Sequence, residues 1–205
     1  MSRPVTIYAE MTPNPKTMKF VADHMLLSSG EIVEFLSPTD AKGYSTLAEA
    51  LFNFPFVSRI FIAQNFVTVY KNDMIEWSDV SLEMRDFIRE WLMENEKAVQ
   101  KIPEKSKIEI VSDSKTKTTN ISPIINTEMD QKIVDLINEY IQPAVEQDGG
   151  AIHFQSYNED NGQVTVLLKG SCSGCPSSTA TLKGGVENLL KTHIPEISEV
   201  VALNG

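Results

Sequence analysis

Alternating apolar and polar residues mark several short strands in the first part of the chain. β-branched and aromatic residues dominate these runs, which is typical of strands. The polar pair Gln64-Asn65 separates the last two runs and predicts a hairpin between them. The predicted strands are Val5–Ala9, Met18–Val21, Ile32–Phe35, Val57–Ile62 and Phe66–Tyr70.

The segment Ser45–Phe54 has the features of a short helix. Its leucines recur at helical spacing, and Ser45 is a favoured N-cap residue. Pro55 ends the helix, because a proline disfavours the helical conformation in the residue before it. The preceding segment, Ser37-Pro38-Thr39-Asp40, is predicted to be a turn.

A longer helix is predicted to start at a cap, Ser78 or Asp79, and to run through Glu96. Its predicted apolar face consists of Leu82, Phe87, Ile88, Trp91 and Leu92. Strands and helices that share one apolar core form a compact layered domain. We therefore predict an α+β domain over residues 1–97.

Residues 98–125 change character, because Lys, Ser and Thr become frequent there. Ser112–Asn120 holds no apolar residue at all. Such a segment buries too little apolar surface to offset the entropy lost on ordering. We predict a flexible linker, in which Ile108–Val111 is a candidate for a short strand.

The periodic pattern returns in residues 126–205. Thr127 and Asp130 resemble a capping box, with Asp in place of the usual Glu. The helix that follows is predicted to be kinked or ended by Pro143. Its apolar face consists of Met129, Ile133, Leu136, Ile137, Tyr140 and Ile141.

The remainder of this second domain predicts two strands, a helix and a last strand. Ala151–Tyr157 and Gln163–Leu168 are joined through Asn161-Gly162, a strong hairpin dipeptide. The helix is Ser177–Lys191 and the last strand is Ile197–Leu203. The chain therefore reads as two small α+β domains joined by a flexible linker, the second with the order α-β-β-α-β.

The formal net charge of the chain is −10, from 18 basic and 28 acidic residues. Proteins that bind nucleic acid carry basic surfaces, so this charge argues against nucleic acid and against anionic membranes as partners. No apolar run reaches the roughly 18 residues that suggest a membrane span. Met1–Glu10 resembles neither a signal peptide nor an Arg- and Ser-rich transit peptide, so we expect a cytoplasmic location.

Gly170–Ser178 contains the only two cysteines of the chain, Cys172 and Cys175. Two thiols at this spacing bind one soft metal ion or close on each other as a disulfide. In a reducing compartment they favour metal or redox chemistry over a structural disulfide. Pro176 suits the first position of a helix. Cys175 is therefore predicted at or beside the N-cap, where the helix dipole favours a thiolate.

Two sulfurs do not complete a metal site, because structural zinc and cubane clusters take four ligands. His153, in a predicted strand, and His193, at a helix end, lack ligand spacing to the cysteines, and His24 belongs to the other domain. Ligand counting therefore favours two chains, related by a two-fold axis, that each donate Cys172 and Cys175.

Three features of the second domain carry a resemblance to a known family. They are Asp148-Gly149-Gly150, the Asn161-Gly162 hairpin, and the Gly170–Ser178 loop before a helix. Together they resemble the C-terminal, NifU-type domain of Nfu proteins over about Thr127–Leu203.

The first domain resembles the Nfu N-terminal domain. The similar segments are Thr12–Phe20, Leu47–Phe52 and Phe66–Val69. The chain departs from the family pattern at Pro55-Phe56-Val57, where a Gly-Val pair is usual.

The resemblance implies an iron–sulfur cluster scaffold or carrier and not an enzyme. Such proteins hold a labile 4Fe–4S cluster between the C-x-x-C motifs of a dimer, which implies Cys172 and Cys175 as ligands of a shared cluster. It also implies apo iron–sulfur proteins as clients, upstream cluster assembly machinery as a partner, and a homodimer when the cluster is bound.

Two other functions stay open. A C-x-x-C motif before a helix is also the pattern of dithiol oxidoreductases, although the order here is not βαβ and no aromatic residue precedes Cys172. A structural zinc site shared across an interface is equally compatible with thiolate ligands. Colour separates the metals, since an anaerobically purified iron–sulfur protein is brown and a zinc protein is colourless.

Two further features have competing interpretations. Asp148-Gly149-Gly150 either shapes the pocket of the cysteine loop or is only a turn that needs glycine, and we favour the turn. The phenylalanines of the first domain are interpreted as core residues in preference to a client-binding patch. They are Phe52, Phe54, Phe56, Phe61 and Phe66.

Overall fold

The computed structural model describes residues 4–28, 30–95, 97–103, 127–173 and 176–204. The chain divides into two compact units, Met1–Pro103 and Glu104–Gly205. Both units combine helices with strands, which confirms the predicted α+β class. Most of the predicted linker lies outside the described residues, including Ser112–Asn120 and the candidate strand Ile108–Val111.

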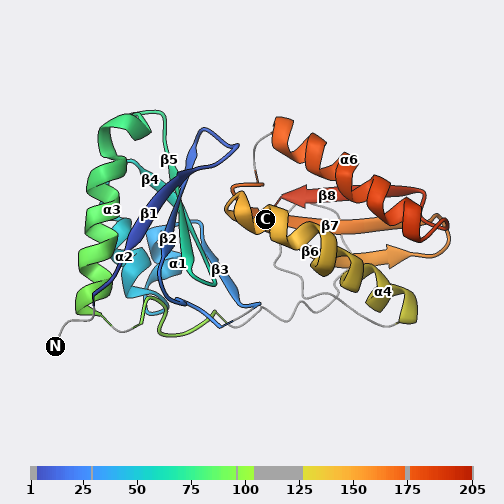
Figure 1. The fold of residues 1–205 in the computed structure, drawn as a ribbon, viewed down its shortest axis with the longest axis horizontal. Coiled ribbons are helices and arrows are strands. Elements are labelled where there is room, and N and C mark those ends of the chain that lie inside the picture. The colour runs from blue at the N-terminus through green and yellow to red at the C-terminus, as the bar shows by residue number, and fades with distance from the viewer. Residues whose placement is uncertain (1–3, 29, 96, 104–126, 174–175, 205) are drawn as a thin grey trace. The chain divides into compact units, whose positions relative to one another are not determined.

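The first unit is built on a five-stranded antiparallel sheet with the strand order β1-β2-β5-β4-β3 (Figure 1). All the predicted strands are present, with ends that differ by one to a few residues. β4 and β5 form the predicted hairpin. The strands are β1 (Ile7–Met11), β2 (Thr17–Ala22), β3 (Ile32–Phe35), β4 (Val57–Ala63) and β5 (Phe66–Lys71).

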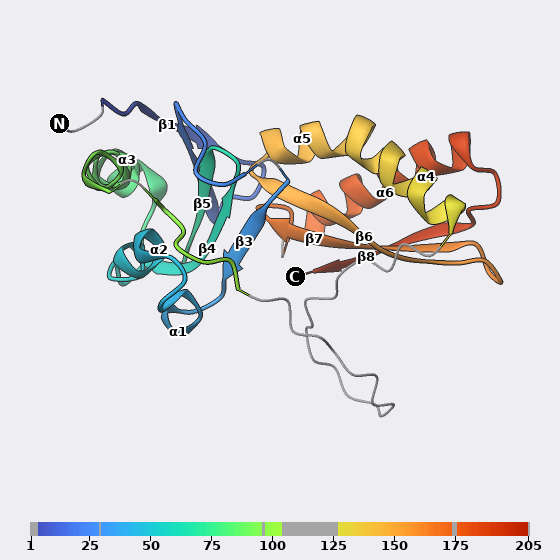
Figure 2. The same ribbon diagram turned by 90° about the horizontal axis from the view of Figure 1, so that it is seen from below.

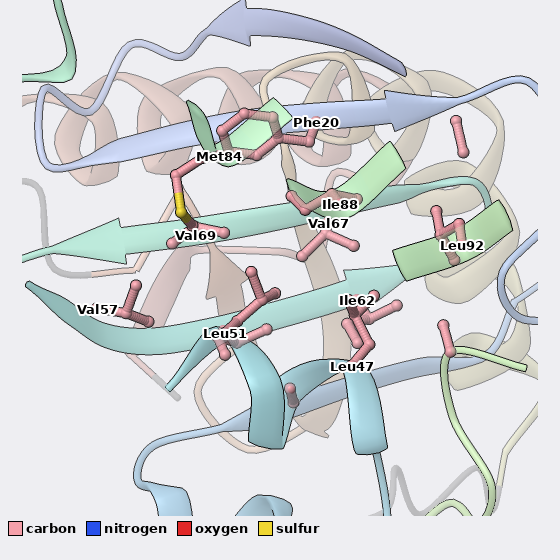
Figure 3. Close-up of a cluster of buried hydrophobic side chains, with 14 of the residues drawn as sticks. Phe20, Leu47, Leu51, Val57, Ile62, Val67, Val69, Met84, Ile88 and Leu92 are labelled. Carbon is pink, nitrogen blue, oxygen red and sulfur yellow. The ribbon is translucent and has the colours of Figure 1, made fainter. Parts of the chain in front are cut away.

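Three helices cover one face of this sheet (Figure 2): α1 (Pro38–Ala41), α2 (Thr46–Leu51) and α3 (Trp77–Glu94). Apolar side chains of the helices and of the sheet meet in one cluster (Figure 3), and removing their surface from water stabilises the unit. The cluster includes Phe20, Leu47, Leu51, Val57, Ile62, Val67, Val69, Met84, Ile88 and Leu92.

Three helix predictions for the first unit were wrong in detail. α3 starts at Trp77 after the N-cap Glu76, which makes no side-chain cap bond, and not at Ser78 or Asp79. The predicted turn at Ser37–Asp40 is the start of α1, because Ser37 is its N-cap and accepts a hydrogen bond from the amide of Asp40. In α3, Leu82 is 61% exposed, and Met84 is buried in its place. Leu82 lies about 200° around the helix from Met84, so the two side chains cannot share one buried face.

Ser45 caps α2 as predicted and also fixes the segment after α3. Its Oγ accepts from the amide of Ala48 at 3.0 Å and donates to the carbonyl of Ala98 at 2.7 Å. Ser45 is fully buried and Ala98 nearly so. The packing of the first unit thus continues past residue 97, where we predicted the linker to begin.

Ser45→Ala should lower the free energy of unfolding by about 1–2 kcal/mol, because it removes a cap and leaves the buried carbonyl of Ala98 without this donor. Urea unfolding measures the change. Ser37→Ala is the matched control, since its cap bond is longer, at 3.3 Å, and exposed. Equal losses in the two variants would show that the second bond of Ser45 contributes nothing.

The second unit opens with a continuous helical segment. α4 (Glu128–Leu136) starts at the predicted capping box, in which Thr127 and Asp130 bond each other's backbone amides. A π-helical turn, Ile137–Ile141, then leads into α5 (Gln142–Gln147).

Pro143 was predicted to kink or end this helix, and the prediction of an end is wrong, because Pro143 lies in the first turn of α5. A proline inside a regular α-helix clashes with the carbonyl four residues before it. The wider spacing of a π turn directly before α5 changes this geometry, so the helical path continues through the proline.

The rest of the second unit is a three-stranded sheet with the order β6-β7-β8, in which β6 pairs antiparallel and β8 parallel to β7. α6 (Pro176–His193) connects β7 to β8 and lies with α4 and α5 on one face (Figure 2). The strands are β6 (Gly150–Asn158), β7 (Gln163–Gly170) and β8 (Glu199–Asn204). The core includes Ile133, Ile152, Val164, Val166, Leu168, Val186, Leu190 and Val200.

The carboxylate of Glu187 joins α6 to β8. It accepts from the Nζ of Lys191 at 2.6 Å and from the amide of Val200 at 3.1 Å. These two bonds, the Lys191 bond first, lower the pKa of Glu187 below its ordinary value of 4.5, against a smaller opposing effect of burial. A lowered pKa in the folded state means that the stabilisation is complete above pH 4.5 and is lost as the pH falls through the folded value.

Glu187→Gln should therefore lower the free energy of unfolding by about 0.5–1.5 kcal/mol at neutral pH, and this difference from the wild type should shrink as the pH falls below about 4.5. Urea unfolding at several pH values measures it. Glu159→Gln, at an exposed position, is the control and should change little. A difference that stays constant down to low pH would contradict the assigned role.

Candidate metal centre

The cysteine loop begins where β7 ends and leads into α6. Gly170 closes β7 with a positive φ of 60°, and its carbonyl accepts from the amide of Ser173 at 2.8 Å. This tight turn reverses the chain directly around Cys172. The loop follows the carboxyl end of β7 and leads into α6, which connects β7 to the parallel strand β8. The cysteines therefore lie in a βαβ unit, and our expectation that their surroundings are not βαβ is wrong.

Cys172 is buried, with 5% of its surface exposed, and belongs to the apolar core of the second unit. The neighbouring Ser171 and Ser173 are also buried, at 2% each. Ser171 Oγ lies 3.9 Å from Cys172 Sγ, so a hydroxyl is within reach of the sulfur. Cys175 lies outside the described residues.

The Asp148-Gly149-Gly150 turn is packed against the cysteine loop. Gly149 has a positive φ of 82°, as a tight turn requires, and its carbonyl accepts from the amide of Ser171 at 3.2 Å. The Oγ of Ser171 donates to the carbonyl of Asp148. The segment is therefore a turn, as we favoured, and it also lines the loop, which was the interpretation that we ranked lower.

Gly150 lies against the sulfur of Cys172. A Cβ at this position would lie 2.8 Å from Cys172 Sγ and 2.7 Å from the carbonyl oxygen of Lys169, and real Cβ atoms do not approach so closely. Gly150 thus needs to be glycine for reasons of space, whereas Gly149 needs it for backbone conformation. The sequence analysis missed this role. The turn needs only one glycine, so the second glycine in Gly149-Gly150 was a sign of a further requirement.

The two histidines considered as extra ligands do not join Cys172. His153 follows Gly150 by three residues in β6, and side chains alternate along a strand, so His153 points to the opposite face of the sheet. His193 ends the 18-residue helix α6, about 25 Å from its start, and stacks on Tyr140 with ring centroids 5.8 Å apart.

Cys172 does not sit in a complete metal site within the described part of one chain. Among those residues, no group of three or more His, Cys, Asp or Glu side chains is arranged to hold a metal ion. The described donor in the loop is the sulfur of Cys172, a soft ligand that suits zinc, copper(I) or iron–sulfur clusters. Any metal centre at Cys172 therefore needs further donors from outside the described residues of one chain.

Comparison with known families matches both units. The model of the scaffold protein Nfu/NifU N-terminal domain matches residues 7–95, and the model of the NifU-like domain matches residues 133–201. The first range covers β1 through α3, and the second runs from within α4 to within β8 and includes the cysteine loop.

Two similar curated proteins are named NFU1 iron-sulfur cluster scaffold homolog, mitochondrial. The protein from Drosophila ananassae is 34% identical over 97% of this chain and 64% of its own length. The protein from Drosophila willistoni is 33% identical over 97% of this chain and 63% of its own length. A solution NMR structure of a NifU-like protein from Saccharomyces cerevisiae is 27% identical, with a TM-score of 0.42, and covers 47% of this chain and 86% of that protein. The chain thus spans slightly under two thirds of the two curated relatives.

The expected cytoplasmic location is wrong in light of these relatives, because both are named as mitochondrial proteins. Targeting segments stand apart from the folded domains, so the composition of the domains does not record the compartment. Among the described residues, no helix combines the length and apolarity needed to cross a membrane.

Proposed function

The chain belongs to the Nfu/NifU family of iron–sulfur cluster scaffold proteins, and we propose that it binds a labile 4Fe–4S cluster as cargo and delivers it to apo-proteins. The ligands in this proposal are Cys172 and Cys175 from each of two copies. One observation carries it: Cys172 Sγ lies against Gly150 in a loop that backbone hydrogen bonds hold, and the described residues contain no group of three or more His, Cys, Asp or Glu side chains that could hold a metal ion within one copy.

The number of thiolate ligands indicates how many copies share the cluster. Each copy supplies two thiolates, and a cubane cluster takes four. Two copies about a two-fold axis complete the set with identical contributions. The metal–sulfur bonds then supply much of the association energy, so the dimer is tight with the cluster and weak without it.

In this proposal the cluster is delivered by exchange of thiolate ligands at iron, which a site shared between two copies allows. A client thiolate forms one Fe–S bond while one Fe–Sγ bond to the carrier breaks, and the displaced thiolate takes up a proton from solvent. No electron is gained or lost in the exchange. Since each copy holds only half of the ligands, the cluster leaves in steps and no enzymatic residue is proposed.

The burial of Cys172 favours this reading over a dithiol oxidoreductase. Reactive cysteines of that class lie in partially exposed sites, because a partner thiol must reach the sulfur. Cys172 is 5% exposed and packs in the core. The shared zinc site differs only in the metal, and iron and sulfide analysis distinguishes it.

The test is anaerobic reconstitution of the full chain, followed by iron and sulfide analysis and by size-exclusion chromatography with light scattering. We expect one 4Fe–4S cluster per two chains, a dimer when loaded, and a monomer or weak association without cluster. Mixing the loaded protein with an apo 4Fe–4S enzyme should activate it faster than free iron and sulfide do. A cluster held stably by a monomer would refute the shared site.

A further inference from the structure

Strand β1 is an open edge of the first sheet. In the described part of the chain it pairs with β2 alone, and β2 pairs on its other side with β5. Four of the five residues of β1 are exposed, including Tyr8 at 61% and Met11 at 89%. The large side chains of Tyr8 and Met11 are therefore exposed to solvent, on a strand that has one unused hydrogen-bonding side.

The register identifies the unused backbone groups. The amide of Asp23 donates to the carbonyl of Thr6 at 3.1 Å, so Thr6 and Asp23 are a hydrogen-bonded pair next to the ladder. Hydrogen-bonded pairs alternate along antiparallel strands, which gives Tyr8 and Glu10 the bonds to β2. The N–H and C=O groups of Ile7, Ala9 and Met11 point away from the sheet.

This edge has none of the features that usually block strand addition. Natural edge strands are protected by prolines, by lysines, by bulges or by inward-facing charges. β1 reads Ile-Tyr-Ala-Glu-Met, and its register with β2 is continuous from Ile7 to Met11. The single charge, Glu10, is paired with Lys19 at 3.2 Å. The edge is thus open to another strand.

We propose that β1 pairs with β1 of a second copy of this chain, antiparallel and centred on Ala9. A two-fold axis at Ala9 places Ile7 opposite Met11 of the second copy and Tyr8 opposite Glu10 of the second copy. Apolar residues then meet apolar ones, and no two like charges face each other, which favours the pair. The two sheets join into one continuous sheet.

The occupant is a second copy because the strand is complementary to itself. The inference also rests on the proposed function, since that site needs two copies. A weak pairing of first units raises the effective concentration of the second cysteine motif.

Ala9→Pro tests the pairing in the full, cluster-free chain. The amide of Ala9 points outward, so the proline removes no bond to β2, and edge strands tolerate proline there. Sedimentation equilibrium should show concentration-dependent dimerisation of the wild type and at least a roughly tenfold weaker association of the variant. Met25→Ser removes an apolar side chain that is 53% exposed elsewhere and should leave the association unchanged.

A charge exchange tests the register. In the proposed pair residue 9 faces its own copy, so Ala9→Lys alone and Ala9→Glu alone should each be monomeric. An equal mixture of the two variants should associate again as a heterodimer. A strictly monomeric wild type, unchanged association of Ala9→Pro, or a mixture that stays monomeric would each overturn the inference.

Cluster content keeps this inference separate from the proposed function. None of these variants touches the cysteine loop, so iron and sulfide per chain after reconstitution should equal the wild-type values. If the wild type associates through β1 and takes up no cluster, the proposed function fails and the pairing stands. If it takes up one cluster per two chains and Ala9→Pro associates like the wild type without cluster, the pairing fails and the function stands.

Discussion

Cys172→Ala should abolish cluster binding while the second unit remains folded. The substitution removes one sulfur atom from the core, and the cost in unfolding free energy should be about 1 kcal/mol, near that of one buried methylene. The loss of one thiolate from each copy leaves a shared cluster with two ligands in place of four. Absorbance and iron and sulfide content after anaerobic reconstitution should fall to background.

Val200→Ala is the matched control for this prediction. Val200 is fully buried in β8 in the same core, and its truncation should cost about 1–3 kcal/mol, as much as the cysteine change or more. Val200 pairs with Val164, near the start of β7, whereas the cysteine loop follows the end of that strand. The remaining folded protein should therefore take up the cluster normally. A Cys172→Ala protein that keeps the wild-type 4Fe–4S spectrum would remove Cys172 from the ligand set.

Local sequence signals were sufficient for most of the fold. The strands of the first sheet follow from β-branched alternation, and the hairpin between β4 and β5 follows from a polar pair between two such runs. Ser45 and the Thr127–Asp130 capping box were predicted because a cap bonds amides within a few residues of itself. Such features depend on neighbours in the sequence and little on tertiary contacts.

The errors concern features of the helices that tertiary packing determines. Leu82 fits a helical apolar pattern, yet the face of α3 that meets the sheet is centred near Met84 and Ile88. Pro143 predicts a kink or an end of the helix, and the π turn before α5 lets the helical segment continue through it. Neither outcome is encoded by the residue type alone, because both depend on how the segment packs against its sheet.

The candidate site also combines features that local sequence predicts with features that depend on tertiary contacts. The C-x-x-C spacing is local and identified the loop, whereas the burial of Cys172 depends on β7, α6 and the turn before β6 folding around it. The closeness of Gly150 to the sulfur joins the start of β6 to the loop after β7, which the hairpin separates in the sequence. Only the paired register of β6 and β7 brings Gly150 opposite Gly170.

Gly150→Ala should have the largest effect on stability among the glycine changes in this loop region. The new Cβ would meet the carbonyl oxygen of Lys169 at 2.7 Å and Cys172 Sγ at 2.8 Å. The carbonyl belongs to the β6–β7 ladder and moves little, so the strain should lower the free energy of unfolding by about 1–3 kcal/mol. The sulfur is also displaced, so the folded protein should retain less cluster after removal of free iron and sulfide.

Gly184→Ala makes the same chemical change in α6 and should have the opposite sign. Apart from the chain neighbours and the backbone of its own helix, no atom lies within 4 Å of a Cβ at Gly184, and alanine favours a helix interior over glycine by about 0.5–1 kcal/mol. Urea unfolding of both variants therefore separates the loss of space from the mere addition of a methyl group. Cluster retention separates the two roles of Gly150, since a purely structural role predicts normal retention once the protein is folded. If Gly150→Ala is as stable as Gly184→Ala and holds its cluster as long, Gly150 does not position Cys172.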